Sequence, residues 1–316
     1  MNRRDVLAAL ALAAAPAFPS AQAKRTFRVA ICGGRAERKM WRGLFAAQGL
    51  HDGGNVSLEL FDWDEDPARV REIVASGPDA VLLPGGGLIA LFMKATTRIP
   101  IVFYSLGADP VTMGLVQSYR RPGGNVTGTT NHGIAVAEKG WEVLKEMRPR
   151  AKRIGAFFDT GYLKESWFPL VREAQFTAAS HLGLERVEIV VPASGGSATA
   201  QRAVTDARVE LLDIAWGDWP WAWDFNEFLI QAAIPALWEL PWQVKKGGLL
   251  ALIGSMDEAR TEAARIVAAI LRGADPATTP VYEVRRIDLT LNLRTARRMN
   301  LEIPKSVLLR ADTLVE

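Results

Sequence analysis

The stretch PDAVLLPGGGLIALFMKATTRIPIVFYSLGADP, residues 78–110, sets out the repeating unit of this 316-residue chain. Its apolar run Ala80 to Leu83 predicts a buried strand, and the glycines that follow predict a turn. Leu88 to Thr96 has the length of a helix, and Ile101 to Tyr104 predicts the next strand. Strand, helix and strand in this order indicate a βαβ unit, whose two strands pair in parallel.

The same alternation runs outward from this unit in both directions. Further strands are predicted at residues 29–32, 56–61, 154–158, 187–191, 209–215 and 235–238. Helical patterns lie at residues 36–48, 67–75, 166–181 and 200–208, with a shorter one within 225–233. Strands that alternate with helices of this length predict an α/β fold of parallel sheets flanked by helices.

The second half of the chain echoes the first. Ile99-Pro100-Ile101 opens a strand in the first half, and Ile234-Pro235-Ala236 opens one at the matching place in the second. A Gly-Gly pair and another apolar run follow each of them, at residues 123–129 and 247–253. This order predicts two similar lobes. Because ligands in such folds bind beyond the carboxyl ends of the strands, we expect the site in the cleft between the lobes.

The composition excludes several functional classes. With 49% hydrophobic and 23% charged residues, the chain is typical of globular proteins. The 38 basic and 35 acidic residues leave a net charge of +3, which gives little support for nucleic-acid binding. The single cysteine, Cys32, excludes an internal disulfide, and we expect it to be buried and free. The sequence shows no nucleophile elbow or HExxH motif, which disfavours an enzyme, and we predict no cofactor and no metal.

Residues 1–23 have the three parts of a secretory signal peptide. Arg3 and Arg4 form a positive start, an apolar run extends from Val6 to Ala15, and Ala21-Gln22-Ala23 offers a cleavage site. The apolar run is too short to span a bilayer. We therefore expect an exported, periplasmic protein. The paired arginines leave both Sec and twin-arginine export open.

Two stretches carry a family resemblance. PIVFYSLGADPVTMGLV, Pro100 to Val116, and RRPGGNVTGTT, Arg120 to Thr130, resemble periplasmic substrate-binding proteins of ABC transporters, in the branch related to tryptophan-binding proteins. The C-terminal part is similar as well, from Gly247-Gly248-Leu249 through Leu291 to Ala296 and on to Asp312. The resemblance implies the type I periplasmic binding fold, with two Rossmann-like lobes joined by three crossings. We place lobe 1 at residues 24–128 and 254–283, and lobe 2 at 129–253 and 284–316.

Candidate ligand contacts in lobe 1 follow its strands. Gly34 and Arg35 follow the first strand, and Gly86 and Gly87 form the turn into a helix. Glycines let a ligand approach the backbone, and an arginine can clamp a carboxylate, although each group can equally serve a plain turn. Tyr104 and Asp109 end the fourth strand, where Asp109 has an alternative role as the cap of the next turn.

Candidate contacts in lobe 2 are mainly aromatic. The segment WGDWPWAW, residues 216–223, holds four tryptophans, of which Trp216 and Trp219 are expected on the cleft side. Aromatic rings stack on aromatic ligands and attract cations, but tryptophans also dominate cores. The other candidates follow neighbouring strands of this lobe and are Asp159, Tyr162, Trp238 and Glu239.

The resemblance implies that the protein is an exported receptor that presents a small solute to an ABC permease of the inner membrane. We expect a monomer that binds a small molecule, with an aromatic or amino-acid-like solute as the candidate class. A ligand-sensing module for a membrane receptor and an exported α/β enzyme are the alternatives.

Overall fold

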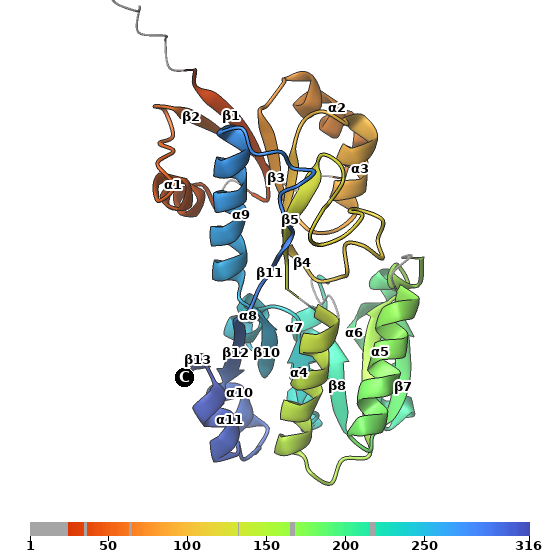
Figure 1. The fold of residues 1–316 in the computed structure, drawn as a ribbon. Coiled ribbons are helices and arrows are strands. Elements are labelled where there is room, and N and C mark those ends of the chain that lie inside the picture. Colours follow the sequence, from red (N-terminus) through yellow and green to blue (C-terminus); the bar gives the residue numbers. More distant parts are fainter. Residues whose placement is uncertain (1–24, 35–36, 63–64, 132, 165–167, 215–218) are drawn as a thin grey trace, which may run out of the picture.

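Two separate sheets, each flanked by helices, make up the computed structural model of the chain (Figure 1). The structure describes residues 25–34, 37–62, 65–131, 133–164, 168–214 and 219–316. The first sheet has the strand order β11-β5-β4-β3-β1-β2, and all of its pairs are parallel. Its strands are β1 (Phe27–Cys32), β2 (Val56–Phe61), β3 (Ala80–Pro84), β4 (Ile101–Leu106), β5 (Val126–Thr130) and β11 (Tyr282–Glu283).

Helices cover both faces of this first sheet. On one face lie α1 (Arg38–Ala46) and α9 (Met256–Leu271), and on the other α2 (Pro67–Ala75) and α3 (Gly87–Ala95). The α2 helix begins where the sequence predicts it, because Pro67 presets the first helical residue and the Asp66 carboxylate accepts a hydrogen bond from the Ala68 N–H at 2.8 Å. The strand β2 also has its predicted bounds.

The second sheet has the order β13-β12-β10-β9-β8-β6-β7, and β10 and β12 are its antiparallel pair. Its strands are β6 (Arg153–Asp159), β7 (Glu185–Val191), β8 (Leu211–Ile214), β9 (Ala236–Trp238), β10 (Leu250–Gly254), β12 (Ile287–Asn292) and β13 (Thr313–Val315). One face packs on α4 (Gly133–Met147), α5 (Phe168–His181), α10 (Leu293–Arg298) and α11 (Lys305–Arg310), the other on α6 (Gly196–Ala207), α7 (Ala222–Gln231) and α8 (Pro241–Lys246). The 3₁₀ turns η2 (Tyr162–Lys164) and η3 (Ala193–Gly195) lie in loops of this part of the chain.

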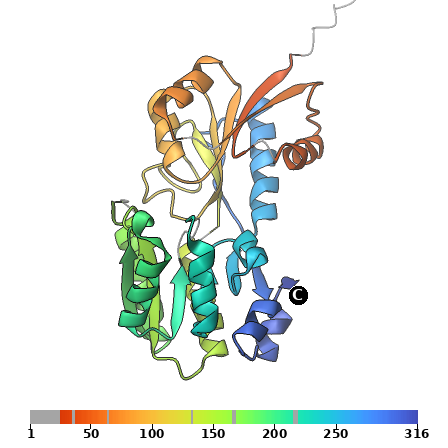
Figure 2. The same cartoon turned by 180° about the vertical axis from the view of Figure 1, so that it is seen from behind.

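The chain passes between the two sheets three times (Figure 2). It crosses after Thr130 of β5, returns after Gly254 of β10, and crosses again after Glu283 of β11. The α4 helix follows the first crossing and lies where no helix was predicted from the sequence. The division into lobes at residues 128, 253 and 283 stays a prediction.

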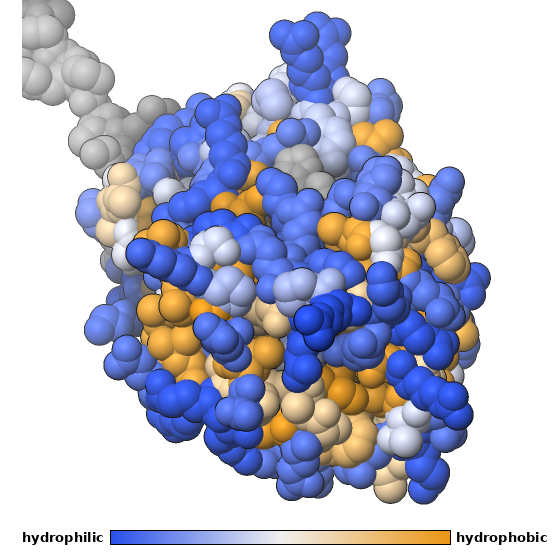
Figure 3. Space-filling model, turned by 90° about the horizontal axis from the view of Figure 1, so that it is seen from below, coloured by the Kyte–Doolittle hydropathy of each residue, from blue (hydrophilic) through white to orange (hydrophobic). Residues whose placement is uncertain are grey.

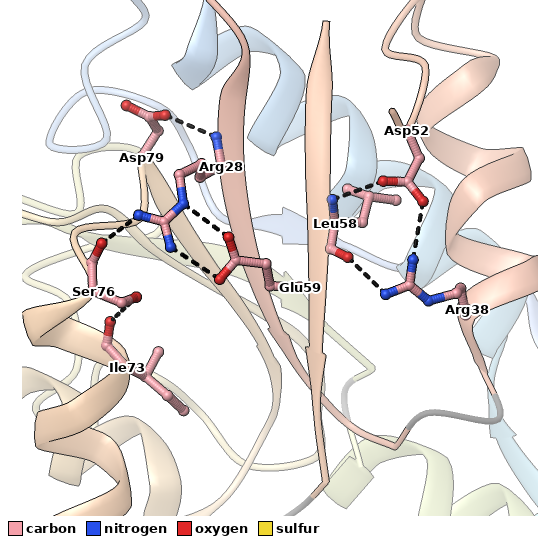
Figure 4. Close-up of polar contacts among 8 residues, drawn as sticks. All are labelled: Arg28, Arg38, Asp52, Leu58, Glu59, Ile73, Ser76 and Asp79. Atoms are coloured by element: carbon pink, nitrogen blue, oxygen red, sulfur yellow. Dashed lines mark hydrogen bonds and ion pairs between the residues drawn. The ribbon is translucent and has the colours of Figure 1, made fainter. Parts of the chain in front are cut away.

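Side chains fasten the outer strand of the first sheet (Figure 4). The Arg28 guanidinium on β1 donates two hydrogen bonds to the Glu59 carboxylate on β2, at 2.8 and 3.1 Å. On the outer side of β2, the Asp52 carboxylate accepts from the Leu58 N–H at 3.0 Å, and Arg38 of α1 donates to the Leu58 carbonyl at 3.1 Å. These contacts tie α1 and β2 together.

Candidate functional site

The carboxyl ends of the two sheets face each other. The chain leaves β5 at its carboxyl end and enters the second lobe directly, and it leaves β10 at its carboxyl end and enters α9 on the first. Because β1 to β5 are parallel, and β6 and β8 to β10 are parallel, all these strands end at the same boundary. This boundary is where an open α/β sheet binds its ligands.

Glycine turns form the first lobe's side of the boundary. Gly34 has a φ of 108° and Gly86 a φ of 113°, in the left-handed region that favours glycine. A Cβ on Gly85 would lie 3.0 Å from the Cα of Leu106, so packing also demands glycine there. Gly87 begins α3 beside the Glu65 carboxylate. These turns bring bare backbone to the strand ends, while Arg35 lies outside the described residues.

Tyr104 lies in the core of the first lobe rather than open to solvent. Its side chain is buried, and its ring packs edge-to-face with Trp41, with the ring centroids 5.0 Å apart. Its hydroxyl donates a hydrogen bond to the Glu37 carboxylate at 3.4 Å. Burial, together with the Glu37 charge, raises the pKa of Tyr104 well above its usual value. Glu37 is also paired with Arg260 of α9 at 2.8 Å, and both side chains are partly exposed. This ion pair was not expected from the sequence, because 223 positions separate its members.

Asp109 has the capping geometry that the sequence offered as its alternative role. Its carboxylate accepts from the N–H groups of Val111 and Thr112, at 2.7 and 2.8 Å, and from the Tyr119 hydroxyl at 3.3 Å. Burial and the neighbouring Asp109 charge raise the pKa of Tyr119. Asp109 therefore shapes the loop after β4 through three hydrogen bonds.

The structure brings Trp219 and Asp159 together at the carboxyl end of β6. The Trp219 indole N–H approaches the Asp159 carboxylate at 3.5 Å, and its ring stacks on Trp221 with centroids 4.8 Å apart. Trp219 is 6% exposed, and Asp159 is half-buried. Asp159 also accepts from the Gly161 N–H at 2.6 Å. Trp216 and the Tyr162 side chain lie outside what the structure describes.

A second aromatic group packs inside the same lobe. Trp238 is fully buried and stacks on Trp223, with the ring centroids 5.7 Å apart. Its ring therefore belongs to the core beneath α7 and α8. The Lys246 ammonium lies 5.3 Å from the Trp223 ring and 5.1 Å from the Trp242 ring. The protein's own lysine thus lies at these ring faces, where the sequence suggested a cationic ligand. Glu239, directly after β9, is half-buried.

Two hollows lie at the opposite end of the second lobe, which Figure 3 shows from below with apolar patches on a mostly hydrophilic surface. One, of about 590 Å³, is lined by α4 residues, Leu182 and Pro304; the other, of about 480 Å³, by residues 147–151, 209–210 and 232–234. The second lies where β6, β8 and β9 begin, away from the facing strand ends.

Among the described residues, no cluster of three metal-binding side chains occurs, and no helix has the length and apolar character needed to cross a membrane.

The fold defines a class. An L-tryptophan complex from Streptococcus pneumonia has a TM-score of 0.78 at 22% identity, covering 92% of this chain and all of that one. A conserved domain protein of Vibrio cholerae has a TM-score of 0.74 at 25% identity, with the same coverage. Such neighbours are type I periplasmic binding proteins, and this chain has their fold.

The chain belongs to the ABC transporter substrate-binding protein family, whose model matches residues 45–315. A tyrosine-binding protein of Clostridioides difficile (strain R20291) is 31% identical over 117 residues, 36% of this chain. The match spans about a third of that relative's length, 33%. The expected family and fold are thereby confirmed.

Proposed function

We propose that this protein captures a small aromatic or amino-acid-like solute between its two lobes and presents it to an ABC permease of the inner membrane. The observation that carries the proposal is the pair of facing strand ends, joined by three crossings, in a chain of the substrate-binding family. Two similar proteins, one named for tyrosine and one solved with L-tryptophan, support this solute class.

The proposed contacts come from both lobes. The glycine turns at Gly34 and Gly86–Gly87 offer backbone groups, while Trp219 offers a ring beside the Asp159 carboxylate. A zwitterionic aromatic solute would meet both kinds of group when the lobes close in hinge fashion. The protein acts as a monomer that binds without chemistry, and residues 1–23 direct its export to the periplasm.

Differential scanning fluorimetry of the chain that starts at Lys24 tests the proposal. L-Tryptophan, L-tyrosine and other amino acids are screened, since a ligand that binds only the folded state raises the melting temperature. We expect an aromatic amino acid to raise it and L-lysine to leave it unchanged. L-Tyrosine is then titrated by calorimetry and by indole fluorescence. The absence of any shift with aromatic solutes contradicts the proposed solute class.

A further inference from the structure

The three crossings lie side by side and are tied into one bundle. The Thr130 carbonyl in the first crossing accepts a hydrogen bond from the Val284 N–H in the third, at 3.0 Å. Gly254, at the second crossing, lies so close to the first that a Cβ there would come within 2.8 Å of the Asn131 carbonyl oxygen. The Ser255 N–H donates to the Arg286 carbonyl at 2.8 Å, which links the second crossing to the third.

One carboxylate fixes the third crossing to the first lobe. Glu258, in the first turn of α9, accepts hydrogen bonds from the N–H groups of Arg285 and Arg286, at 3.0 and 2.9 Å, and from the Tyr282 hydroxyl at 2.8 Å. The α9 helix itself packs against β3, β4 and β5. The backbone is therefore held to the first lobe as far as residue 286 by charge-assisted hydrogen bonds.

The next residue already belongs to the other lobe. Ile287 begins β12 and pairs with Gly254 of β10 in the second sheet. The change from one lobe to the other thus takes place within one or two residues of the Glu258 clamp. Such an abrupt change concentrates the backbone rotation of a hinge at a few positions.

The first crossing carries a side-chain amide that is only partly paired among the described residues. The Asn131 side-chain amide donates to the Ser105 hydroxyl at 2.7 Å, and Ser105 has a φ of 60°. The other end of the amide, Oδ1, is buried and has no hydrogen-bond partner among the described residues. Leaving a buried acceptor unpaired costs free energy, so this crossing is not held by a fully satisfied set of hydrogen bonds among the described residues.

We propose that Glu258 is the positioning residue of the hinge: its carboxylate holds residues 285 and 286 against α9, confines lobe rotation to the adjoining backbone, and so sets how readily the lobes close. A looser clamp gives a broader set of lobe orientations in the free protein. Binding must then restrict more motion, which weakens solute affinity without any change at the solute contacts. This effect on affinity rests on the proposed function, whereas the hinge geometry does not.

The test compares Glu258→Gln with Glu262→Gln, which removes a carboxylate one turn further along α9 that pairs with Arg265 in the same helix. Spin labels at Lys94→Cys and Glu173→Cys, both exposed and in different lobes, report the lobe-to-lobe distance. Without solute, we expect Glu258→Gln to broaden the distance distribution and Glu262→Gln to leave it as in the parent protein. The affinity for L-tryptophan, used as the probe, should fall at least about fivefold in Glu258→Gln alone.

Tyr282→Phe removes one of the three hydrogen bonds and should broaden the distribution less, in the same direction. This milder variant decides the question if Glu258→Gln does not fold. An unchanged distribution in the folded variant, or equal broadening in Glu262→Gln, overturns the proposal. If the parent protein binds neither L-tryptophan nor L-tyrosine, the proposed solute class fails, while the distance measurement still tests the hinge.

Discussion

The two lobes differ in the residues that lie at and behind their shared boundary. The first lobe ends its strands in glycine turns, at Gly34 and Gly85–Gly87, and its ion pair Glu37–Arg260 is partly exposed. In the second lobe, β9 ends in the buried indole of Trp238, the Trp219 indole lies beside Asp159 at the end of β6, and the Asp213 carboxyl is buried under α4 and α5. Glycine turns carry no side chain that a substitution could remove and no group that titrates. Buried rings and a buried carboxyl, by contrast, make the free energy of unfolding depend on substitution and on pH. We therefore expect substitutions and changes of pH to lower stability more in the second lobe than in the first.

The largest effect is expected at Trp238. Because this ring is fully buried in the core of the second lobe, Trp238→Ala should lower the free energy of unfolding by about 3–5 kcal/mol. Urea denaturation measures the loss. Trp242→Ala, which removes a ring that is 36% exposed, is the matched control and should cost much less. If Trp238→Ala kept full stability but lost solute binding, Trp238 would be a cleft residue and not part of the core of the second lobe.

The next effect concerns pH. Burial raises the pKa of Asp213 from 3.8 to about 6, although Trp141 donates to it at 2.8 Å and Gln175 at 3.3 Å. The folded state therefore holds a proton that the unfolded state releases between pH 4 and 6. Asp213 stabilises the fold fully below about pH 4, and this contribution is lost as pH rises through about 6, by up to about 3 kcal/mol.

Asp213→Asn should remove this dependence. We expect the free energy of unfolding of the variant to gain on that of the parent protein as pH rises from 4 to 7. Urea midpoints of both proteins across this range provide the measurement. Asp206→Asn, at an exposed carboxylate of the same lobe, should run parallel to the parent. Parallel curves for Asp213→Asn as well would show that the buried carboxylate does not titrate in this range.

The glycine side of the boundary should respond less. A Cβ at Gly85 would meet both the backbone and the side chain of Leu106, so Gly85→Ala should cost about 1–3 kcal/mol through overpacking. Gly43→Ala is the control, since nothing lies within 4 Å of its new methyl group on α1; it should stabilise by about 0.5–1 kcal/mol. Thermal denaturation distinguishes the two. If Gly85→Ala left the melting temperature unchanged, the turn after β3 would be able to accommodate a side chain. The expected difference between the two lobes would then not hold for the first lobe.

The smallest effect is expected at Lys246. Its ammonium lies over two indole rings at a largely exposed site, so Lys246→Met should cost about 0.5–1 kcal/mol. Lys245→Met, at the neighbouring exposed lysine, is the reference. Chemical denaturation at low and high salt separates the two variants. Equal stability of both would show that the cation–ring contacts contribute nothing.

The fold followed from the sequence because strand and helix alternation is a local pattern. β2 and α2 occur at the predicted residues, and the resemblance supplied the crossings. The site was harder to predict, since its partners come from distant segments. Nothing local joins Glu37 to Arg260 or Asn131 to Ser105. Composition alone also cannot tell a stacked core indole such as Trp238 from one that faces a ligand.

The side chains along the outer edge of β2 also bear on how the folded protein resists aggregation. β2 is the last strand of its sheet, and an open strand edge is a template onto which another chain can add. Asp52 and Arg38 occupy both the N–H and the carbonyl of Leu58, in the middle of that edge. An incoming strand would have to displace two charged groups, so this edge is protected against aggregation at high concentration.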